Sequence, residues 1–130
     1  MRRAEVRRET LETRVEVNLN LDGMGLAEIK TGVSFLNHLL GAVSKHGLID
    51  LNILAESREE ADSHHLVEDT AIAVGQAINA ALGEKKGIRR FGFALVPMDE
   101  AIAEIALDLS GRGFFVFEGD LSPAATAGME

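Results

Sequence analysis

The sequence of 130 residues contains no cysteine, and none of its apolar runs is long enough to cross a membrane. Without thiols the chain can form neither a disulfide scaffold nor a thiolate metal site, so a bound metal would need histidine and carboxylate ligands. A membrane-spanning helix takes roughly 20 apolar residues, and the charged N-terminus lacks the apolar core of a signal peptide. We therefore expect a cytoplasmic protein with no membrane partner.

Basic residues are scarce as well, since 13 Lys and Arg stand against 21 Asp and Glu, for a formal net charge of −8. A chain of this charge is not expected to bind nucleic acid through a general electrostatic surface. The basic residues nevertheless gather in two places, within residues 2–8 and 85–90. An acidic protein that binds an anionic small molecule would need such local exceptions, and ordinary solvated surface charge is the alternative.

The apolar content of 46% excludes disorder, and the length is typical of one compact domain. Strict alternation of apolar and polar residues over 12–22 predicts a strand with one buried face. The turn residues Asp22-Gly23 and a further extended run at 26–31 indicate that these two strands form a hairpin. Four more strands are expected, at 48–55, 91–96, 101–109 and 114–117.

Two segments show the spacing of an amphipathic helix instead. The first covers 33–46 and is ended by Gly47, and the second covers 64–82 and is ended by Gly83. The second helix should meet the sheet through its apolar stripe, which consists of Val67, Ala71, Val74, Ile78 and Leu82. Strands in groups with two intervening helices predict an α+β fold, a two-layer α/β sandwich in which a mixed sheet packs on helices.

The chain also repeats itself. A shift of 88 positions lays residues 12–23 over 100–111. We therefore predict a pseudo-repeat of half-domains, with a first half-domain at 1–97 and the beginning of an incomplete second one at 98–130. The identical pairs are Glu12/Glu100, Glu16/Glu104, Leu19/Leu107, Leu21/Leu109 and Gly23/Gly111.

His64, His65 and Glu68 carry the most chemical information, because they stand at the start of the second predicted helix. A helix advances ~100° per residue, so His64 and Glu68 share a face while the adjacent histidines diverge. Two neutral imidazoles and a carboxylate suit a divalent ion such as Mn, Fe, Co or Zn. Divergent rings fit two separate ions better than one, and a plain polar helix cap is the alternative.

His38, near the start of the first predicted helix, is a third candidate imidazole. These ligands do not fill two coordination spheres, so the others would come from a second copy of the repeat, another subunit, substrate or water. His46 stands at the end of the same helix, where we expect it to interact with the last carbonyl groups.

Arg90 and Arg112 are candidates for binding an anion. Each lies close to glycine at the end of a predicted strand, where a guanidinium group can hold a phosphate through two hydrogen bonds. A structural or surface role is the alternative for both. Glu12, Asp99 and Glu100 are candidate acid–base groups, and for the last two an ordinary turn between strands is the competing explanation.

Six segments resemble, in order, the imidazoleglycerol-phosphate dehydratase family of histidine biosynthesis. They extend over nearly all of the chain, and Asn37 stands where the family often has Asp. The segments are residues 8–13, 31–38, 62–69, 87–92, 97–100 and 108–112.

The resemblance implies a manganese-dependent hydro-lyase that removes water from D-erythro-imidazole-glycerol phosphate to give imidazole-acetol phosphate. It implies two Mn²⁺ ions per complete active site, two similar halves, and a large homo-oligomer with sites between subunits. Glu12 would be an acid–base group that contacts substrate, and Arg90 and Arg112 would contact the substrate or its phosphate. The implied metal ligands, also close to substrate, are His38, His64, His65 and Glu68.

Family members carry a second helix with the paired histidines and a C-terminal phosphate-binding segment, neither of which occurs in this sequence. Half of each metal shell is therefore expected to be missing from it. Three hypotheses remain open at this stage: a dehydratase sequence with weak activity on its own, a half-protein that pairs with itself across a two-fold axis, and a non-catalytic interaction module.

Overall fold

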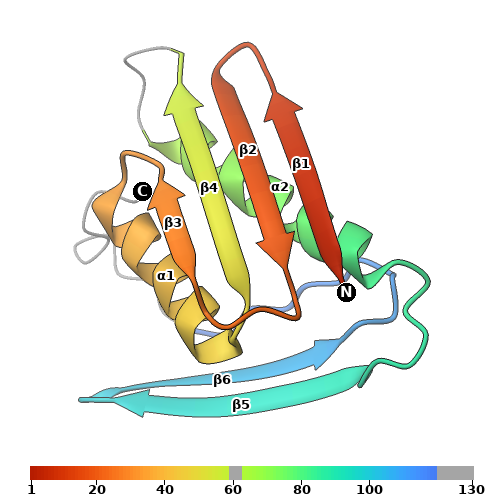
Figure 1. Ribbon diagram of the computed structural model, residues 1–130. Coiled ribbons are helices and arrows are strands. Elements are labelled where there is room, and N and C mark those ends of the chain that lie inside the picture. Colours follow the sequence, from red (N-terminus) through yellow and green to blue (C-terminus); the bar gives the residue numbers. More distant parts are fainter. Residues whose placement is uncertain (59–62, 120–130) are drawn as a thin grey trace. The chain divides into compact units, whose positions relative to one another are not determined.

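The computed structural model describes residues 1–58 and 63–119, which form two compact units. The larger unit, Met1–Leu82, contains β1 (Arg3–Glu9), β2 (Thr13–Asn20), β3 (Ala27–Lys30), α1 (Ser34–Gly47), β4 (Asp50–Ser57) and α2 (His64–Leu82). The smaller unit, Gly83–Glu118, contains β5 (Phe91–Met98) and β6 (Ala101–Asp108), as labelled in Figure 1. Neither helix has the length and apolar character that crossing a bilayer would require.

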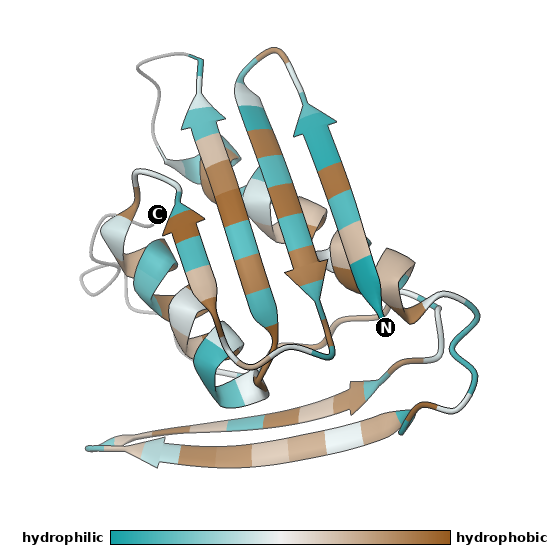
Figure 2. Ribbon diagram, viewed as in Figure 1, coloured by the Kyte–Doolittle hydropathy of each residue, from teal (hydrophilic) through white to brown (hydrophobic). Residues whose placement is uncertain are grey.

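The sheet of the larger unit is mixed and has the strand order β1-β2-β4-β3 (Figure 1). β2 pairs antiparallel with β1 and β4, whereas β3 runs parallel to β4. The alternation along β2 places Val15, Val17 and Leu19 on one face, where they are 0–4% exposed, and Figure 2 shows the alternation as bands. Both helices cover this face. The predicted α+β sandwich of a mixed sheet on helices is confirmed.

α2 has the predicted bounds and packs on β1 and β2 through alanine. Ala73, Ala77 and Ala81 are four residues apart and at most 7% exposed, because only small side chains let the helix backbone come this close to the sheet. The predicted contact stripe is confirmed in part: Val74 and Ile78 pack against the core, whereas the most deeply buried contacts are made by alanines outside the stripe. Of its members Ala71 is exposed, and Val67, Val74, Ile78 and Leu82 are partly buried.

α1 lies against β3 and β4, and its start is held by Asn37. The side-chain carbonyl of Asn37 accepts hydrogen bonds from the backbone N–H and the hydroxyl of Thr31, at 3.2 and 2.6 Å. An amide oxygen can accept both bonds, so a carboxylate is not required at this position. Gly47 does not end the helix from outside, as predicted, but is its last residue. The left-handed conformation falls on Leu48, with φ 52°.

The predicted hairpin between 12–22 and 26–31 is wrong, because β3 lies on the far side of β4 from β2. Alternation shows which face of a strand is buried but does not identify its partner. The connecting segment is held by the carboxylate of Asp50, which accepts hydrogen bonds from the backbone N–H groups of Met24 and Leu26 at 2.9 and 3.1 Å. A Cβ on Gly23 would lie 2.4 Å from the backbone nitrogen of Asp50, so the chain passes β4 only with glycine there.

β1 was not predicted, because its three arginines and Arg2 just before it have the pattern of a basic cluster. The strand alternates nevertheless: Ala4 and Val6 pack against the core, and Arg8 is on the same face. This alternation was the available sign of a strand. β4 was predicted at 48–55 and lies two residues later.

The β5–β6 hairpin of the smaller unit repeats the β1–β2 hairpin at an offset of 88 residues. β6 occupies the positions of β2 plus 88, and the opposed residues match, with Val6 facing Val17 and Ala94 facing Ile105. Equivalent positions thus pair in both hairpins, as the predicted repeat requires.

Two expectations differ from the structure at this end of the chain. The predicted half-domain boundary between residues 97 and 98 falls inside β5, whereas the structure divides the chain after Leu82. Residues 114–117, predicted as a strand, have no regular structure, because no other described segment pairs with them.

Candidate functional site

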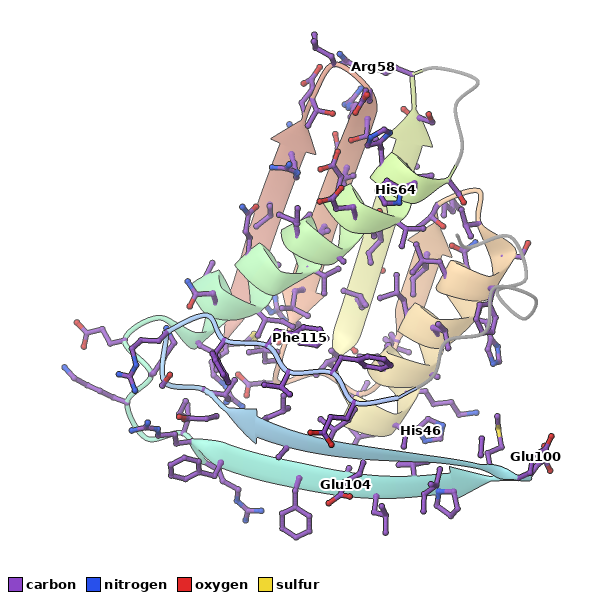
Figure 3. All side chains as sticks on the ribbon, turned by 180° about the vertical axis from the view of Figure 1, so that it is seen from behind. His46, Arg58, His64, Glu100, Glu104 and Phe115 are labelled. Atoms are coloured by element: carbon purple, nitrogen blue, oxygen red, sulfur yellow. The ribbon has the colours of Figure 1, made fainter. Side chains whose placement is uncertain are left out.

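Two imidazoles and a carboxylate lie at the N-terminus of α2, as predicted. The first helical turn is closed by a hydrogen bond from the backbone N–H of Val67 to the carbonyl of Ser63, at 2.9 Å. His64 Nε2 is 4.0 Å from Glu68 Oε2, and both side chains are 59% exposed. Figure 3 shows His64 at this end of the helix. The i, i+4 spacing therefore puts an accessible nitrogen and an accessible oxygen on one helix face.

The rings of His64 and His65 are in edge-to-face contact. Their ring centroids are 5.3 Å apart and the ring planes meet at 78°. Nδ1 of His65 lies 3.6 Å from a carboxylate oxygen of Glu12, in the turn between β1 and β2. This nitrogen is shielded from solvent and has no hydrogen-bond partner within the described residues, whereas the side chain as a whole is 44% exposed. Nε2 is thus the nitrogen that a ligand can reach.

The turn that carries Glu12 is hydrogen-bonded at several points. The backbone N–H groups of Glu12 and Thr13 both donate to the hydroxyl of Thr10, at 3.2 and 3.0 Å. Arg58, just after β4, donates its backbone N–H to the carbonyl of Glu12 at 2.7 Å and its guanidinium to the carbonyl of Thr10 at 3.2 Å. Figure 3 labels Arg58 at this end of the sheet. The backbone of Glu12 is therefore fixed in place.

Asp69 ties α2 to the same turn. Its carboxylate accepts hydrogen bonds from Arg8 Nε at 2.7 Å and from the hydroxyls of Thr13 and Thr10 at 2.5 and 3.4 Å. Asp69 is only 7% exposed and Thr13 is completely buried. Burial raises the pKa of the Asp69 carboxyl, but the hydrogen bonds from Thr13 and Arg8 outweigh it and hold the pKa below its usual value. We call Asp69, Arg8, Thr10 and Thr13 the Asp69 cluster.

The donors at this end of α2 match the nitrogen and oxygen ligands of divalent transition metals. His64 with Glu68 and His65 with Glu12 make two separate pairs, whose imidazole rings are in edge-to-face contact. Within residues 1–58 and 63–119, however, no three His, Asp or Glu side chains are close enough to share a metal ion. His38, the third predicted imidazole, is exposed near the start of α1. The residues thus fit part of a coordination sphere.

The two predicted phosphate contacts lie at one end of the β5–β6 hairpin. Arg90 donates from Nε and Nη2 to the two carboxylate oxygens of Asp108, at 2.6 and 3.0 Å, and its guanidinium lies 4.9 Å from the ring centre of Phe91. The hydrogen bond from Arg90 lowers the pKa of the Asp108 carboxyl, and the charge of Arg112 adds to this effect. Two cationic side chains therefore share one carboxylate, which leaves this end positively charged.

Asp99 and Glu100 form the tight turn at the other end of the hairpin, where Met98 faces Ala101. Asp99 has φ 51°, the left-handed conformation that a two-residue hairpin turn requires. Figure 3 labels Glu100 at the tip. The eight residues of β5 separate this turn from Arg90, a length of about 26 Å. The structure thus gives Asp99 and Glu100 the place of an ordinary turn.

The Asp69 cluster was missed by sequence reasoning. Asp69 stands four residues before Ala73 and eight before Ala77, so it belongs to the helix face that packs on the sheet. A carboxylate on a buried face needs donors, and this requirement was the signal that could have revealed the cluster. It was hidden because the predicted stripe of α2 did not include Asp69, Ala73 or Ala77.

Comparison with known proteins shows which family this chain is similar to. The family model described as imidazoleglycerol-phosphate dehydratase matches residues 31–130. A protein named imidazoleglycerol-phosphate dehydratase from Hydrogenovibrio crunogenus is 48% identical over 130 residues, which are 100% of this chain and 67% of the relative. The protein of the same name from Acetivibrio thermocellus is 50% identical over 129 residues, which are 99% of this chain and 66% of the relative.

Solved structures of the same family have the same fold. The imidazoleglycerol-phosphate dehydratase of Staphylococcus aureus matches with a TM-score of 0.80 and 31% identity, over 97% of this chain and 68% of that one. The enzyme of Pyrococcus furiosus matches with a TM-score of 0.67 and 32% identity, over 94% and 66%. The chain spans about two thirds of the length of the curated relatives it matches.

Proposed function

Because the chain belongs to the imidazoleglycerol-phosphate dehydratase family, we propose that it takes part in removing water from D-erythro-imidazole-glycerol phosphate. The product would be imidazole-acetol phosphate, an intermediate of histidine biosynthesis. The observation that supports this function best is the presence of two imidazole–carboxylate pairs at the start of α2, His64 with Glu68 and His65 with Glu12.

We assign the metal to the residues whose chemistry fits it. His38, His64, His65 and Glu68 would be ligands of Mn²⁺, with two ions in a complete site. When bound, the metal would supply Lewis-acid stabilisation of the negative charge that develops on the substrate's imidazole ring, typically worth several kcal/mol.

Glu12 would move the carbon-bound proton. The proton lost in this reaction is not next to a carbonyl, so the basicity of a carboxylate is insufficient without stabilisation of the ring anion. Glu12 is 47% exposed while its backbone is held by Arg58 and Thr10, so the carboxylate is accessible and extends from a fixed backbone. Both properties suit a general acid–base group.

Arg90 and Arg112 would contact the phosphate of the substrate. Arg90 keeps N–H donors beyond those that bind Asp108, and a guanidinium group binds phosphate well. Each donor pair on α2 lacks further ligands among the described residues. We therefore propose that complete sites form between subunits of a large homo-oligomer.

Metal binding by the purified chain tests this function. Wild-type protein should bind Mn²⁺ and form larger assemblies, as measured by isothermal titration calorimetry and analytical ultracentrifugation. Loss of a residue that only supports a ligand costs roughly 10–100-fold in affinity, so His64→Ala should weaken binding by at least about tenfold.

His46→Ala is the matched control, because His46 is also exposed but lies at the other end of α1, away from His64 (Figure 3). It should bind Mn²⁺ as the wild type does. If neither the wild type nor a chain extended with the second histidine-bearing helix of a relative binds Mn²⁺ and dehydrates substrate, the proposed function is wrong.

A non-catalytic or self-pairing half-protein is the second candidate. It is favoured by the apolar side chains that the smaller unit exposes, among them Phe93 at 91%, Ile102 at 67% and Ile105 at 54%. Such a surface favours association with another protein surface. In this case, ultracentrifugation would show an assembly whose size is unchanged by Mn²⁺, by His64→Ala and by Glu68→Ala. Thermal unfolding would show that its stability is unchanged as well.

A further inference from the structure

The Asp69 cluster joins the face of α2 that packs on the sheet to the turn that carries Glu12. Asp69 directly follows Glu68 in the sequence, and Thr13 directly follows Glu12. The hydroxyl of Thr13 donates a hydrogen bond to the carboxylate of Asp69. One buried carboxylate thus connects the helix bearing His65 with the loop whose carboxylate lies 3.6 Å from the His65 ring. A displacement of the turn would change this distance directly.

The cluster is not needed to form the hairpin. The β5–β6 hairpin has the same register as β1–β2, with β5 one residue longer than β1, yet apolar residues stand at the corresponding positions. With the offset of 88, Arg8, Thr10 and Thr13 correspond to Val96, Met98 and Ala101. The strands, their register and a connecting turn therefore form without a buried ion pair.

A buried ion pair also has an energetic cost. Taking a carboxylate and a guanidinium out of water costs several kcal/mol per ion, and apolar residues of similar volume are often as stabilising or more so. Asp69 is 7% exposed, and the side chain of Arg8 is 31% exposed. The Asp69 cluster thus costs desolvation free energy, and the hairpin does not require it. It lies where the β1–β2 turn meets His65.

We propose that Asp69 is a positioning residue, which holds the β1–β2 turn so that the Glu12 carboxylate faces Nδ1 of His65. This inference rests on the proposed function, in which His65 binds metal and Glu12 moves a proton. A carboxylate at Nδ1 keeps the proton of the neutral ring on that nitrogen and leaves the lone pair of Nε2 directed at the ligand. Asp69 acts on the ring only through Glu12.

The test follows the His65 tautomer by ¹⁵N NMR of the imidazole rings, in metal-free full-length protein with EDTA and at a pH where the rings are neutral. In the wild type the Nδ1–H form of His65 should predominate. Asp69→Asn and Glu12→Gln should each shift His65 toward the Nε2–H form, and the double variant should shift it no further. A purely structural role of Asp69 would not produce this shared effect.

Amide hydrogen exchange provides the second measurement. In Asp69→Asn the backbone N–H groups of Glu12 and Thr13 should exchange at least about tenfold faster than in the wild type, because the turn opens locally. Asp22→Asn is the matched control: it breaks the ion pair with Arg2, at 2.6 Å, at the opposite end of the β1–β2 hairpin. It should change neither the tautomer nor these two exchange rates.

The outcomes are distinct from those of the metal-binding test, because no metal or substrate is present. The inference is overturned if Asp69→Asn leaves the tautomer as in Asp22→Asn, or if Glu12→Gln has no effect on His65. If Asp69→Asn does not fold, Thr13→Val replaces it, since it removes one donor to Asp69 and keeps the volume of the side chain. Failure to bind Mn²⁺ with the tautomer shift intact would instead refute the proposed function alone.

Discussion

At the scale of single residues, the face of α2 that packs on the sheet carries two neighbouring polar side chains in opposite situations. Asp69 accepts hydrogen bonds from three side chains. Thr70 is completely buried, and its hydroxyl has no hydrogen-bond partner among residues 1–58 and 63–119. A buried polar group without a partner loses its hydration and gains nothing in return.

We therefore expect Thr70→Val to stabilise the larger unit. Valine keeps the shape of threonine and removes the unpartnered hydroxyl, which should raise the free energy of unfolding by about 1 kcal/mol. Urea denaturation monitored by far-ultraviolet circular dichroism measures the change.

Thr13→Val is the same chemical change at another completely buried position, and it should have the opposite sign. It removes a donor from the carboxylate of Asp69, so the free energy of unfolding should fall by about 1–3 kcal/mol. Equal effects of the two variants would mean that the hydrogen bonding of these hydroxyls does not decide their contribution.

The sequence alone identified the residues with reactive side chains and missed those that hold them. His64, His65 and Glu68 could be named because their spacing on a helix fixes which faces they share. Glu12 could be named as an acid–base candidate, but its approach to His65 depends on long-range contacts from Arg8 and Arg58. Contacts between residues 46 or more positions apart leave no local pattern.

At the scale of elements, periodicity predicted the helices and most strands within one or two residues but did not predict how strands pair. β3 has a turn before it and an extended run, as a hairpin would, yet it lies beside β4. The feature that decides the position of β3 is Asp50, the first residue of β4. Its carboxylate accepts hydrogen bonds from the backbone N–H groups of Met24 and Leu26. Its role depends on tertiary structure.

The same carboxylate makes stability depend on pH. The hydrogen bonds from Met24 and Leu26 hold the pKa of Asp50 below its usual value. A lowered carboxyl pKa contributes stability that is present above the pKa of the unfolded chain, about 3.9, and lost as the pH falls through the lower folded value. Wild-type protein should therefore lose stability below about pH 4.

Asp50→Asn should remove part of this dependence. The variant should be less stable than the wild type at pH 7, and the difference between them should shrink at about pH 3. Thermal unfolding at both values measures it. Glu28→Gln is a control, because Glu28 pairs only with exposed Lys30 and should leave the unfolding midpoint at pH 7 nearly unchanged. A constant difference between Asp50→Asn and wild type across this range would contradict the assignment.

At the scale of the whole molecule, the hydrophobic core is contributed by the larger unit alone. Its buried residues, among them Val15, Leu51 and Ala77, all lie between positions 15 and 81. The two strands of the smaller unit have no comparable buried cluster among the described residues. A two-stranded hairpin is marginally stable by itself, so most of the folding free energy should reside in residues 1–82.

A chain of residues 1–82 should therefore fold. It should unfold cooperatively in urea, with a free energy within about 10–15% of that of the full chain, which is the error of the extrapolation. A fragment that remains unfolded in native buffer would show that residues 83–130 contribute essential packing.

The two hairpins of this chain pair their strands in the same register, with β5 one residue longer than β1. Neither has gained or lost a position relative to the other, from Arg3 facing Asn20 in the first to Phe91 facing Asp108 in the second. The shared register is therefore compatible with replacing one hairpin by the other as a whole, without inserting or deleting residues. The present differences between the two would then be entirely matters of side-chain chemistry, as expected when a duplicated segment diverges by point substitution alone.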